Sequence, residues 1–266
     1  MSHAFDSVAT PAFAIPGARH ARPDLTGKVA LVTGSSKGIG RAIAEAFVRS
    51  GARVTVSSRT AADVKAAAAE LNEIREGAAV GIPCDVRDPK ACRALVEGTV
   101  AEFGGLDLLV NNAGLGIFAP LQEMDPADWD VQIRTNLDGV FHCSKAAVPH
   151  LIARAAKAPG EAWILNIGSL AGRNAFSGGV AYNATKFGLT GMTEAMMLDL
   201  RHEGVRVSCI MPGSVNTHFF EGGPDPEADW KLTGEDIAGV VLDLVAFPPN
   251  ALPSKVEIRP ARPPKK

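Results

Sequence analysis

Tyrosine is almost missing from this chain of 266 residues: Tyr182 is the only one, beside 11 phenylalanines and 3 tryptophans. Any chemistry that needs a phenol is therefore confined to one position. Cysteine is scarce as well, and the 4 cysteines form no CxxC pair, nor does the chain contain HExxH. We therefore expect reduced thiols in a cytoplasmic protein, without a disulfide framework or a zinc site.

Neither sign of charge predominates, since 27 Lys and Arg face 29 Asp and Glu, a formal net charge of −2. Without a general basic field, nucleic acid is not an expected partner. No apolar run approaches the ~18 residues of a membrane span, so no membrane association is expected. The 46% hydrophobic content predicts a globular protein with a large core.

Residues 1–24 are interrupted by proline and glycine and lack the apolar segment of a secretory signal. Arg19 and Arg22 leave a mitochondrial presequence open. We interpret this stretch as a flexible arm, either a disordered leader or a segment that packs on a neighbouring subunit. Residues 25–266 are predicted to form one domain.

From residue 28 onward, short aliphatic runs alternate with helical patterns. The runs are residues 28–33, 53–58, 78–86, 106–112, 163–169, 206–212 and 255–260. Helices are expected at 38–51, 61–71, about 88–103, from about 125, across Tyr182 and from 233. Aliphatic runs separated by helices predict parallel strands buried on both faces. The expected fold is a single-domain α/β fold of the Rossmann type, a doubly wound sheet of about seven strands with helices on both faces.

The first strand is followed by the glycine-rich sequence TGSSKGIG, residues 33–40. Glycines between a strand and a helix let the backbone approach a diphosphate, which the free N–H groups of the helix can bind. A tight turn without a ligand is the alternative. The strand before the turn and the helix after it favour the ligand.

Further motifs follow in a definite order: Asn111-Asn112-Ala113-Gly114, Asn136, Ser169, Tyr182-x-x-x-Lys186 and Pro212-Gly213. Together with TGSSKGIG, this set resembles the short-chain dehydrogenase/reductase family over about residues 25–217. The likeness is greatest to members that reduce 3-oxoacyl groups on acyl-carrier protein, although the ending KVEIRPARPPKK departs from theirs. The resemblance implies a nicotinamide cofactor and hydride transfer at a carbonyl or an alcohol.

The glycine turn, the resemblance and the charges after the second strand together predict which residues bind the cofactor. They are Gly34, Ser36, Lys37, Gly38, Ile39, Gly40, Arg59, Asp85, Val86, Asn112, Ala113, Gly114, Tyr182, Lys186, Pro212, Gly213, Val215 and Thr217. Asp85 and Val86 are expected near the adenine.

Charge at the end of the second strand favours NADP(H) over NAD(H). An NAD site needs a carboxylate there for the ribose hydroxyls, whereas this chain has Ser58 and Arg59. Arg59 and Lys37 are both able to bind a 2′-phosphate. A solvated loop charge and a residue that merely begins a helix are the alternatives for these two cations.

Tyr182 and Lys186 lie four residues apart, on one face of the expected helix. A neighbouring ammonium should lower the pKa of the phenol, so that Tyr182 acts as general acid or base. Ser169 can donate to the substrate oxygen, and Lys186 can also bind the nicotinamide ribose. By resemblance, Asn136 holds a water that relays protons from Lys186; from its type alone it would be a capping or packing residue.

The substrate should be a small carbonyl compound or alcohol, such as a ketone or a 3-oxoacyl thioester, contacted by residues 115–118, 170–176 and a mobile loop at 214–231. An NAD-dependent alcohol dehydrogenase of the same fold and a dinucleotide-binding sensor without turnover are the alternatives. Gly188 and Gly191 in the helix of Tyr182 suggest the close approach of another helix, as in a homodimer or homotetramer.

Overall fold

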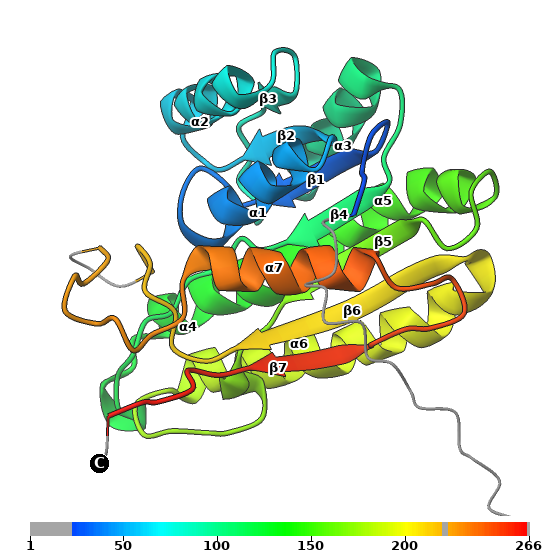
Figure 1. Ribbon diagram of the computed structural model, residues 1–266. Coiled ribbons are helices and arrows are strands. Elements are labelled where there is room, and N and C mark those ends of the chain that lie inside the picture. Colours follow the sequence, from blue (N-terminus) through cyan, green and yellow to red (C-terminus); the bar gives the residue numbers. More distant parts are fainter. Residues whose placement is uncertain (1–22, 220–222, 265–266) are drawn as a thin grey trace, which may run out of the picture.

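A computed structural model of the chain describes residues 23–219 and 223–264. They form a parallel sheet of seven strands in the order β3-β2-β1-β4-β5-β6-β7, as expected (Figure 1). Of the predicted N-terminal arm, residues 1–22 lie outside the described residues.

The strands agree in place with the aliphatic runs of the sequence. They are β1 (Val29–Thr33), β2 (Arg53–Ser57), β3 (Ala79–Gly81), β4 (Leu108–Asn111), β5 (Ala162–Ile167), β6 (Val205–Pro212) and β7 (Lys255–Ile258). Only β3 is much shorter than predicted. Pro83 lacks an N–H group for the ladder, and residues 82–86 instead run on as a loop toward α3.

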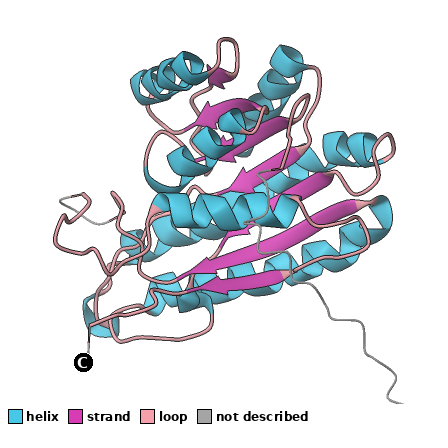
Figure 2. Ribbon diagram, in the orientation of Figure 1, coloured by secondary structure: helices cyan, strands magenta, loops and turns pink. Residues whose placement is uncertain are grey.

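Helices cover both faces of the sheet (Figure 2). They are α1 (Gly38–Arg49), α2 (Ala61–Ile74), α3 (Pro89–Phe103), α4 (Pro126–Ile133), α5 (Gly139–Ala155), α6 (Val180–Leu200) and α7 (Gly234–Val245). Two hydrophobic cores result: Ala30 and Val32 of β1 face α1 and α7, whereas Leu31 faces α3 and α5. This alternation along a strand is what a doubly wound sheet requires.

The helical sequence from residue 125 is not one regular helix. Between α4 and α5 the chain makes a π-helical turn, Arg134–Asp138, which contains the buried Asn136. Such turns occur often at functional sites, because the wider turn changes the direction of one side chain. The sequence pattern contains no sign of this turn.

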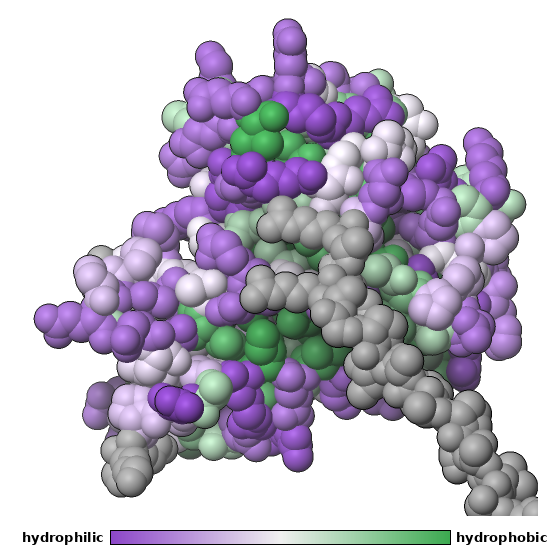
Figure 3. Space-filling view, viewed as in Figure 1, coloured by the Kyte–Doolittle hydropathy of each residue, from purple (hydrophilic) through white to green (hydrophobic). Residues whose placement is uncertain are grey.

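The outer surface is mixed in character. On the face that carries α7, hydrophilic residues surround a smaller area of apolar residues (Figure 3). No helix among the described residues is long and apolar enough to cross a membrane.

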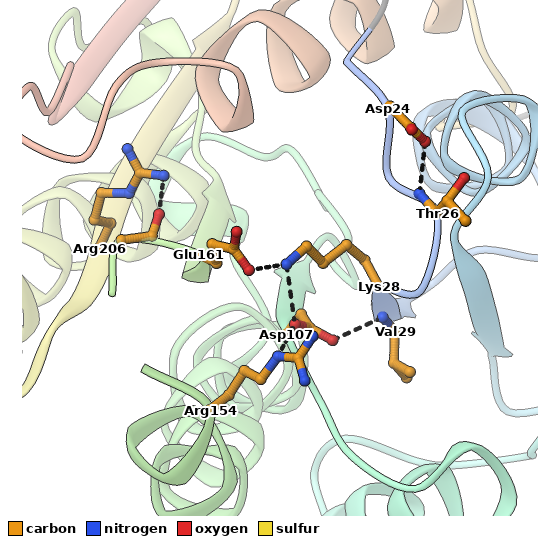
Figure 4. A network of polar contacts seen from close by, with 9 residues as sticks. Asp24, Thr26, Lys28, Val29, Asp107, Arg154, Glu161 and Arg206 are labelled. Atoms are coloured by element: carbon orange, nitrogen blue, oxygen red, sulfur yellow. Dashed lines mark hydrogen bonds and ion pairs between the residues drawn. The ribbon is translucent and has the colours of Figure 1, made fainter. Parts of the chain in front are cut away.

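Ion pairs and a hydrogen bond connect residues at the edge of the sheet where β1, β4 and β5 begin (Figure 4). The Asp107 carboxylate, 2% exposed, accepts the backbone N–H of Val29 at 2.9 Å and pairs with Arg154. Lys28 lies 3.9 Å from the same carboxylate and pairs with Glu161. One buried carboxylate thus joins the starts of β1 and β4 to the end of α5.

We expect Asp107→Ala to lower the free energy of unfolding by about 2–3 kcal/mol, because the Val29 N–H and nearby cations lose a buried partner. Urea denaturation measures this loss. The control is Glu70→Ala, which removes the 63% exposed partner of Arg41 and should cost less than about 1 kcal/mol. Equal losses in the two variants would contradict a special role for Asp107.

Candidate active site

The candidate site lies at the opposite edge of the sheet, where the parallel strands end. β1 ends at Thr33, β4 at Asn111, β5 at Ile167 and β6 at Pro212. Because β1 and β4 are neighbours, the strand order reverses between them. In open α/β sheets such a switch point is where ligands bind.

The glycine turn after β1 is tightly folded. Gly34 and Gly38 both have φ of +62°, a conformation that residues with a side chain rarely adopt. A Cβ atom on Gly40 would lie 2.5 Å from both the Asn112 side-chain nitrogen and the Gly34 carbonyl oxygen. Since no side chain caps the N-terminus of α1, its first N–H groups are available to an anion.

Thr33 and Asn112 join this turn to the end of β4. The Thr33 hydroxyl oxygen accepts the backbone N–H groups of Asn112 and Ala113, both at 3.1 Å. The Asn112 amide group donates to the carbonyl oxygens of Thr33 at 3.0 Å and Gly34 at 2.8 Å. Asn112 and Ala113, predicted as ligand-binding residues, are thus brought against the glycine turn.

The predicted residues after β6 also reach the turn. Thr217 faces Gly38, since its Cβ lies 3.6 Å from where a Cβ of Gly38 would stand. Val215 packs against the α1 core and forms a bridge with Leu232. The described part of the 214–231 segment is folded back by Asn216, which exchanges two 2.8 Å hydrogen bonds with the backbone of Asp225.

The two cations predicted to bind a phosphate lie in the segments that follow β1 and β2. Arg59 and Lys37 are exposed, and the Ser58 hydroxyl is buried without a hydrogen-bond partner among the described residues. Asp85 bonds Arg87, whose Nε lies 2.9 and 3.0 Å from the two carboxylate oxygens. Hydrogen bonds from Arg87 lower the pKa of Asp85, and Arg59 adds to this effect.

Arg87 and Ser58 were not among the predicted site residues. Arg87 lies two positions after Asp85, a spacing that could have suggested the pair. Val86 is buried, and its carbonyl oxygen is bonded by Cys92 and approached by His142.

Tyr182 and Ser169 meet at the carboxyl end of β5. Ser169 caps a short 3-10 turn, Leu170–Gly172, by accepting the N–H of Ala171 at 3.1 Å. Its hydroxyl is also close enough to the Tyr182 phenol to lower the pKa of that phenol. The two groups predicted to handle the substrate oxygen are therefore in contact.

The expectation that Lys186 lowers the pKa of Tyr182 is wrong for this structure. Burial raises the pKa of Tyr182, and only the hydrogen bond from Ser169 opposes the rise. The Lys186 ammonium lies 5.7 Å from the phenol ring centre and donates to the Ile167 carbonyl oxygen at 3.0 Å. Burial also lowers the pKa of Lys186 to about 8, so the lysine is itself a weakened cation.

Asn136 is placed beside Lys186 by the π-helical turn. Its Oδ1 accepts the N–H of Leu115 at 2.9 Å, and its Nδ2 donates to the Leu115 carbonyl oxygen at 2.8 Å. A Cβ on Gly114 would lie 3.2 Å from the Asn136 oxygen and 3.9 Å from the Lys186 nitrogen. Thr185, missed by the sequence analysis, accepts a further bond from Asn136 at 3.1 Å.

The two glycines of α6 do not behave alike. A Cβ on Gly188 would lie 3.2 Å from the Leu137 side chain, so the predicted close approach exists, but to the π-helical turn of the same chain. Nothing lies within 4 Å of such an atom on Gly191. Gly188 is therefore explained within the chain, and the approach of another subunit at Gly191 stays a prediction.

No group of three or more His, Cys, Asp or Glu side chains within the described ranges could hold a metal ion. The site consists instead of hydroxyls, amides, one lysine and a glycine turn. The family model for short chain dehydrogenases matches residues 28–227, which contain all of these groups.

The chain belongs to the short-chain dehydrogenase family. It is 40% identical over 211 residues to the D-threitol dehydrogenase of Mycolicibacterium smegmatis, covering 78% of this chain and 79% of that protein.

Two solved structures extend the likeness to the fold. A metagenomic short-chain oxidoreductase in complex with NADP has 36% identity, a TM-score of 0.77, and coverage of 90% of this chain and 100% of its own. The 3-ketoacyl-(acyl-carrier-protein) reductase from Brucella melitensis, complexed with NADH, has 27% identity, a TM-score of 0.81, and coverage of 90% and 99%. This short-chain dehydrogenase is therefore an oxidoreductase built on the Rossmann-type sheet.

The pKa of Tyr182 can be measured directly, because no other tyrosine contributes to the ultraviolet spectrum of tyrosinate. In the protein without added ligand we expect the transition above the ~10 of a free phenol, because burial disfavours the phenolate. Ser169→Ala should move it higher still, since the hydrogen bond that lowers the pKa is lost.

Tyr182→Phe is the control and should abolish the transition. A midpoint below that of free tyrosine, or a downward shift in Ser169→Ala, would contradict the assigned environment.

Proposed function

We propose that this chain is an NADP(H)-dependent oxidoreductase that transfers a hydride between the nicotinamide and a carbonyl or secondary alcohol. Its direction is the reduction of a ketone or a 3-oxoacyl group. The observation that carries the proposal is the convergence of Tyr182, Ser169 and Lys186 beside the glycine turn at the switch point of the sheet.

The residues at this edge fit a dinucleotide. The uncapped start of α1 and the glycine turn suit a diphosphate, and Thr217 faces the same turn from the β6 side. The unpartnered Ser58 hydroxyl, at the end of β2, suits a ribose oxygen. When bound, the reduced nicotinamide supplies the hydride.

The preference for NADP(H) is supported by charge. Asp85 lies near both Arg59 and Arg87, and Arg87 already holds that carboxylate by hydrogen bonds. The surface at the end of β2 thus keeps a cation for the 2′-phosphate. A diol ribose would find no free carboxylate there.

The proton chemistry rests on Tyr182. Its raised pKa keeps the phenol protonated at neutral pH, which suits a general acid in reduction. The Ser169 hydroxyl, in contact with the phenol, can donate to the substrate oxygen as negative charge develops. Lys186, still mostly protonated at neutral pH, is the group that would resupply the proton, with Asn136 positioned through Leu115 and Gly114.

A second candidate is an NAD-dependent alcohol dehydrogenase. It is favoured by the 40% identity to the D-threitol dehydrogenase and by the NADH in the Brucella structure. The same side chains serve it, with Tyr182 as base. The cofactor preference separates the two candidates.

We also propose a cytoplasmic homodimer or homotetramer in which residues 25–266 form one domain behind the N-terminal arm. Phe141 of α5 and Phe187 and Leu198 of α6 are large apolar side chains that the single chain leaves exposed. Large apolar side chains that a single chain leaves exposed are a feature of interfaces between subunits.

Tyr182→Phe should lower kcat by at least about 100-fold while NADPH binding, followed by fluorescence, changes little, since only the proton donor is removed. The rate of NADPH oxidation with each of a panel of ketones and 3-oxoacyl thioesters measures the loss. Retained turnover would contradict the acid role. Binding of NADPH without turnover by the unaltered protein would instead indicate a sensor.

Arg59→Asp should reduce the ratio of kcat/KM for NADPH to that for NADH by at least about tenfold, because one charge-assisted bond to phosphate is replaced by repulsion. The matched control is Arg201→Asp, which makes the same charge change at the far end of α6. An unchanged ratio in Arg59→Asp would refute the NADP assignment.

A further inference from the structure

Two phenylalanines from separate segments contact the Tyr182 ring, and a third packs against one of them. The ring centres of Phe118 and Phe219 lie 5.4 and 5.8 Å from that of Tyr182, and Phe176 lies 5.7 Å from Phe118. The rings are 37%, 46% and 38% exposed for Phe118, Phe176 and Phe219. Side chains of this size are normally covered, so the cluster presents apolar surface beside the reacting group.

Phe118 and Phe176 are on loops that buried amide side chains hold in place. Gln132, fully buried, accepts the N–H of Ile117 and donates to its carbonyl oxygen, both at 3.1 Å. Asn183 donates to the Ala171 carbonyl oxygen at 2.7 Å and accepts the N–H of Phe176 at 3.3 Å. The positions of Phe118 and Phe176 are thus set from the protein interior.

The two loops are also joined to each other. Ala119 donates to the Gly178 carbonyl oxygen at 2.9 Å and forms a bridge with Gly179. Gly116 faces the rings: a Cβ there would lie 2.6 Å from Phe118 and 3.0 Å from Phe219. Because Gly116 has no side chain, the Phe118 and Phe219 rings have room to pack close to the backbone at this position.

Polar groups are few in this cluster. Residues 115–119, LGIFA, contain no polar side chain, and the charged Arg173 of the neighbouring loop is paired with Glu257 and 62% exposed. A site for a polyhydroxylated substrate would need hydrogen-bonding partners for each hydroxyl, because unpaired buried hydroxyls are costly. The aromatic contacts of Tyr182 in the described chain are both with phenylalanines.

We propose that Phe118, Phe176 and Phe219 form a subsite for an aryl group attached to the reacting carbon, so that the substrate is an aryl ketone. This proposal rests on the proposed function. In the reaction, hydride from the reduced nicotinamide forms the new C–H bond at the carbonyl carbon, and the Tyr182 proton goes to the oxygen. The ketone becomes a benzylic alcohol and the cofactor is oxidised. Flat rings set at an angle to one another are a suitable surface for a further ring.

The first experiment compares three ketones with NADPH: acetophenone, 2-butanone and erythrulose, which is a polyhydroxylated ketone. The subsite predicts a kcat/KM for acetophenone at least about tenfold above the other two, because only acetophenone places a ring among the phenylalanines. A preference for erythrulose would overturn the subsite while leaving the proposed oxidoreductase intact.

Variants locate the effect. Phe118→Ala and Phe176→Ala should each reduce the ratio of kcat/KM for acetophenone to that for 2-butanone by about tenfold. Phe118→Leu keeps an apolar side chain and should give a smaller reduction, which separates lost ring contact from a disturbed fold. The control is Phe247→Ala, which removes an exposed ring after α7. The Phe247 carbonyl oxygen accepts a hydrogen bond from Arg206 at the opposite edge of the sheet, so this variant should leave the ratio unchanged. An unchanged ratio in all Phe118 and Phe176 variants would overturn the proposal.

A binding measurement separates the subsite from the activity. Calorimetric titration of acetophenone into Tyr182→Phe with NADPH should show binding that weakens about tenfold when Phe118→Ala is added. Binding of this kind without turnover by the unaltered protein would support the subsite and refute the proposed reduction of an aryl ketone. Absence of both binding and turnover with acetophenone would refute the subsite.

Discussion

The hydroxyl group of Thr33 ties the carboxyl ends of β1 and β4 together, and the candidate site depends on this contact. Its oxygen receives two backbone N–H groups from the segment after β4, while the Asn112 amide returns two bonds to the end of β1. Thr33 is 2% exposed, so these bonds form away from water, where losing a partner is expensive. These bonds therefore fix the distance between the glycine turn and the Asn112–Gly114 segment. The other parts of the candidate site lie next to these two segments.

Burial then determines the protonation of the two central groups. The pKa of Tyr182 is raised and that of Lys186 is lowered, both by desolvation. In the protein without ligand these shifts favour the neutral forms and keep the phenol as a proton donor. A role as base would need a change in the surroundings of Tyr182, since only the Ser169 hydrogen bond favours the phenolate here.

The sequence predicted the sheet and named most residues of the candidate site, because the signals for both are local. Aliphatic runs indicate buried strands, and the order of TGSSKGIG, NNAG and Tyr182-x-x-x-Lys186 indicates the family. The unpredicted features depend on contacts between distant segments. The π-helical turn at Asn136, the sign of the Tyr182 shift and the meeting of Phe118, Phe176 and Phe219 all arise from tertiary packing, which no short pattern encodes. Gly188 shows the same limit: its signal of close approach was sound, but the partner was Leu137 of its own chain.

The most direct measurement for this account is a crystal structure of the protein with NADPH. We expect the diphosphate across the Gly34 to Gly40 turn, the 2′-phosphate against Arg59, and the nicotinamide beside Tyr182 and Lys186. A dinucleotide bound away from the β1–β4 switch point, or one whose 2′-phosphate contacts neither Arg59 nor Lys37, would contradict it.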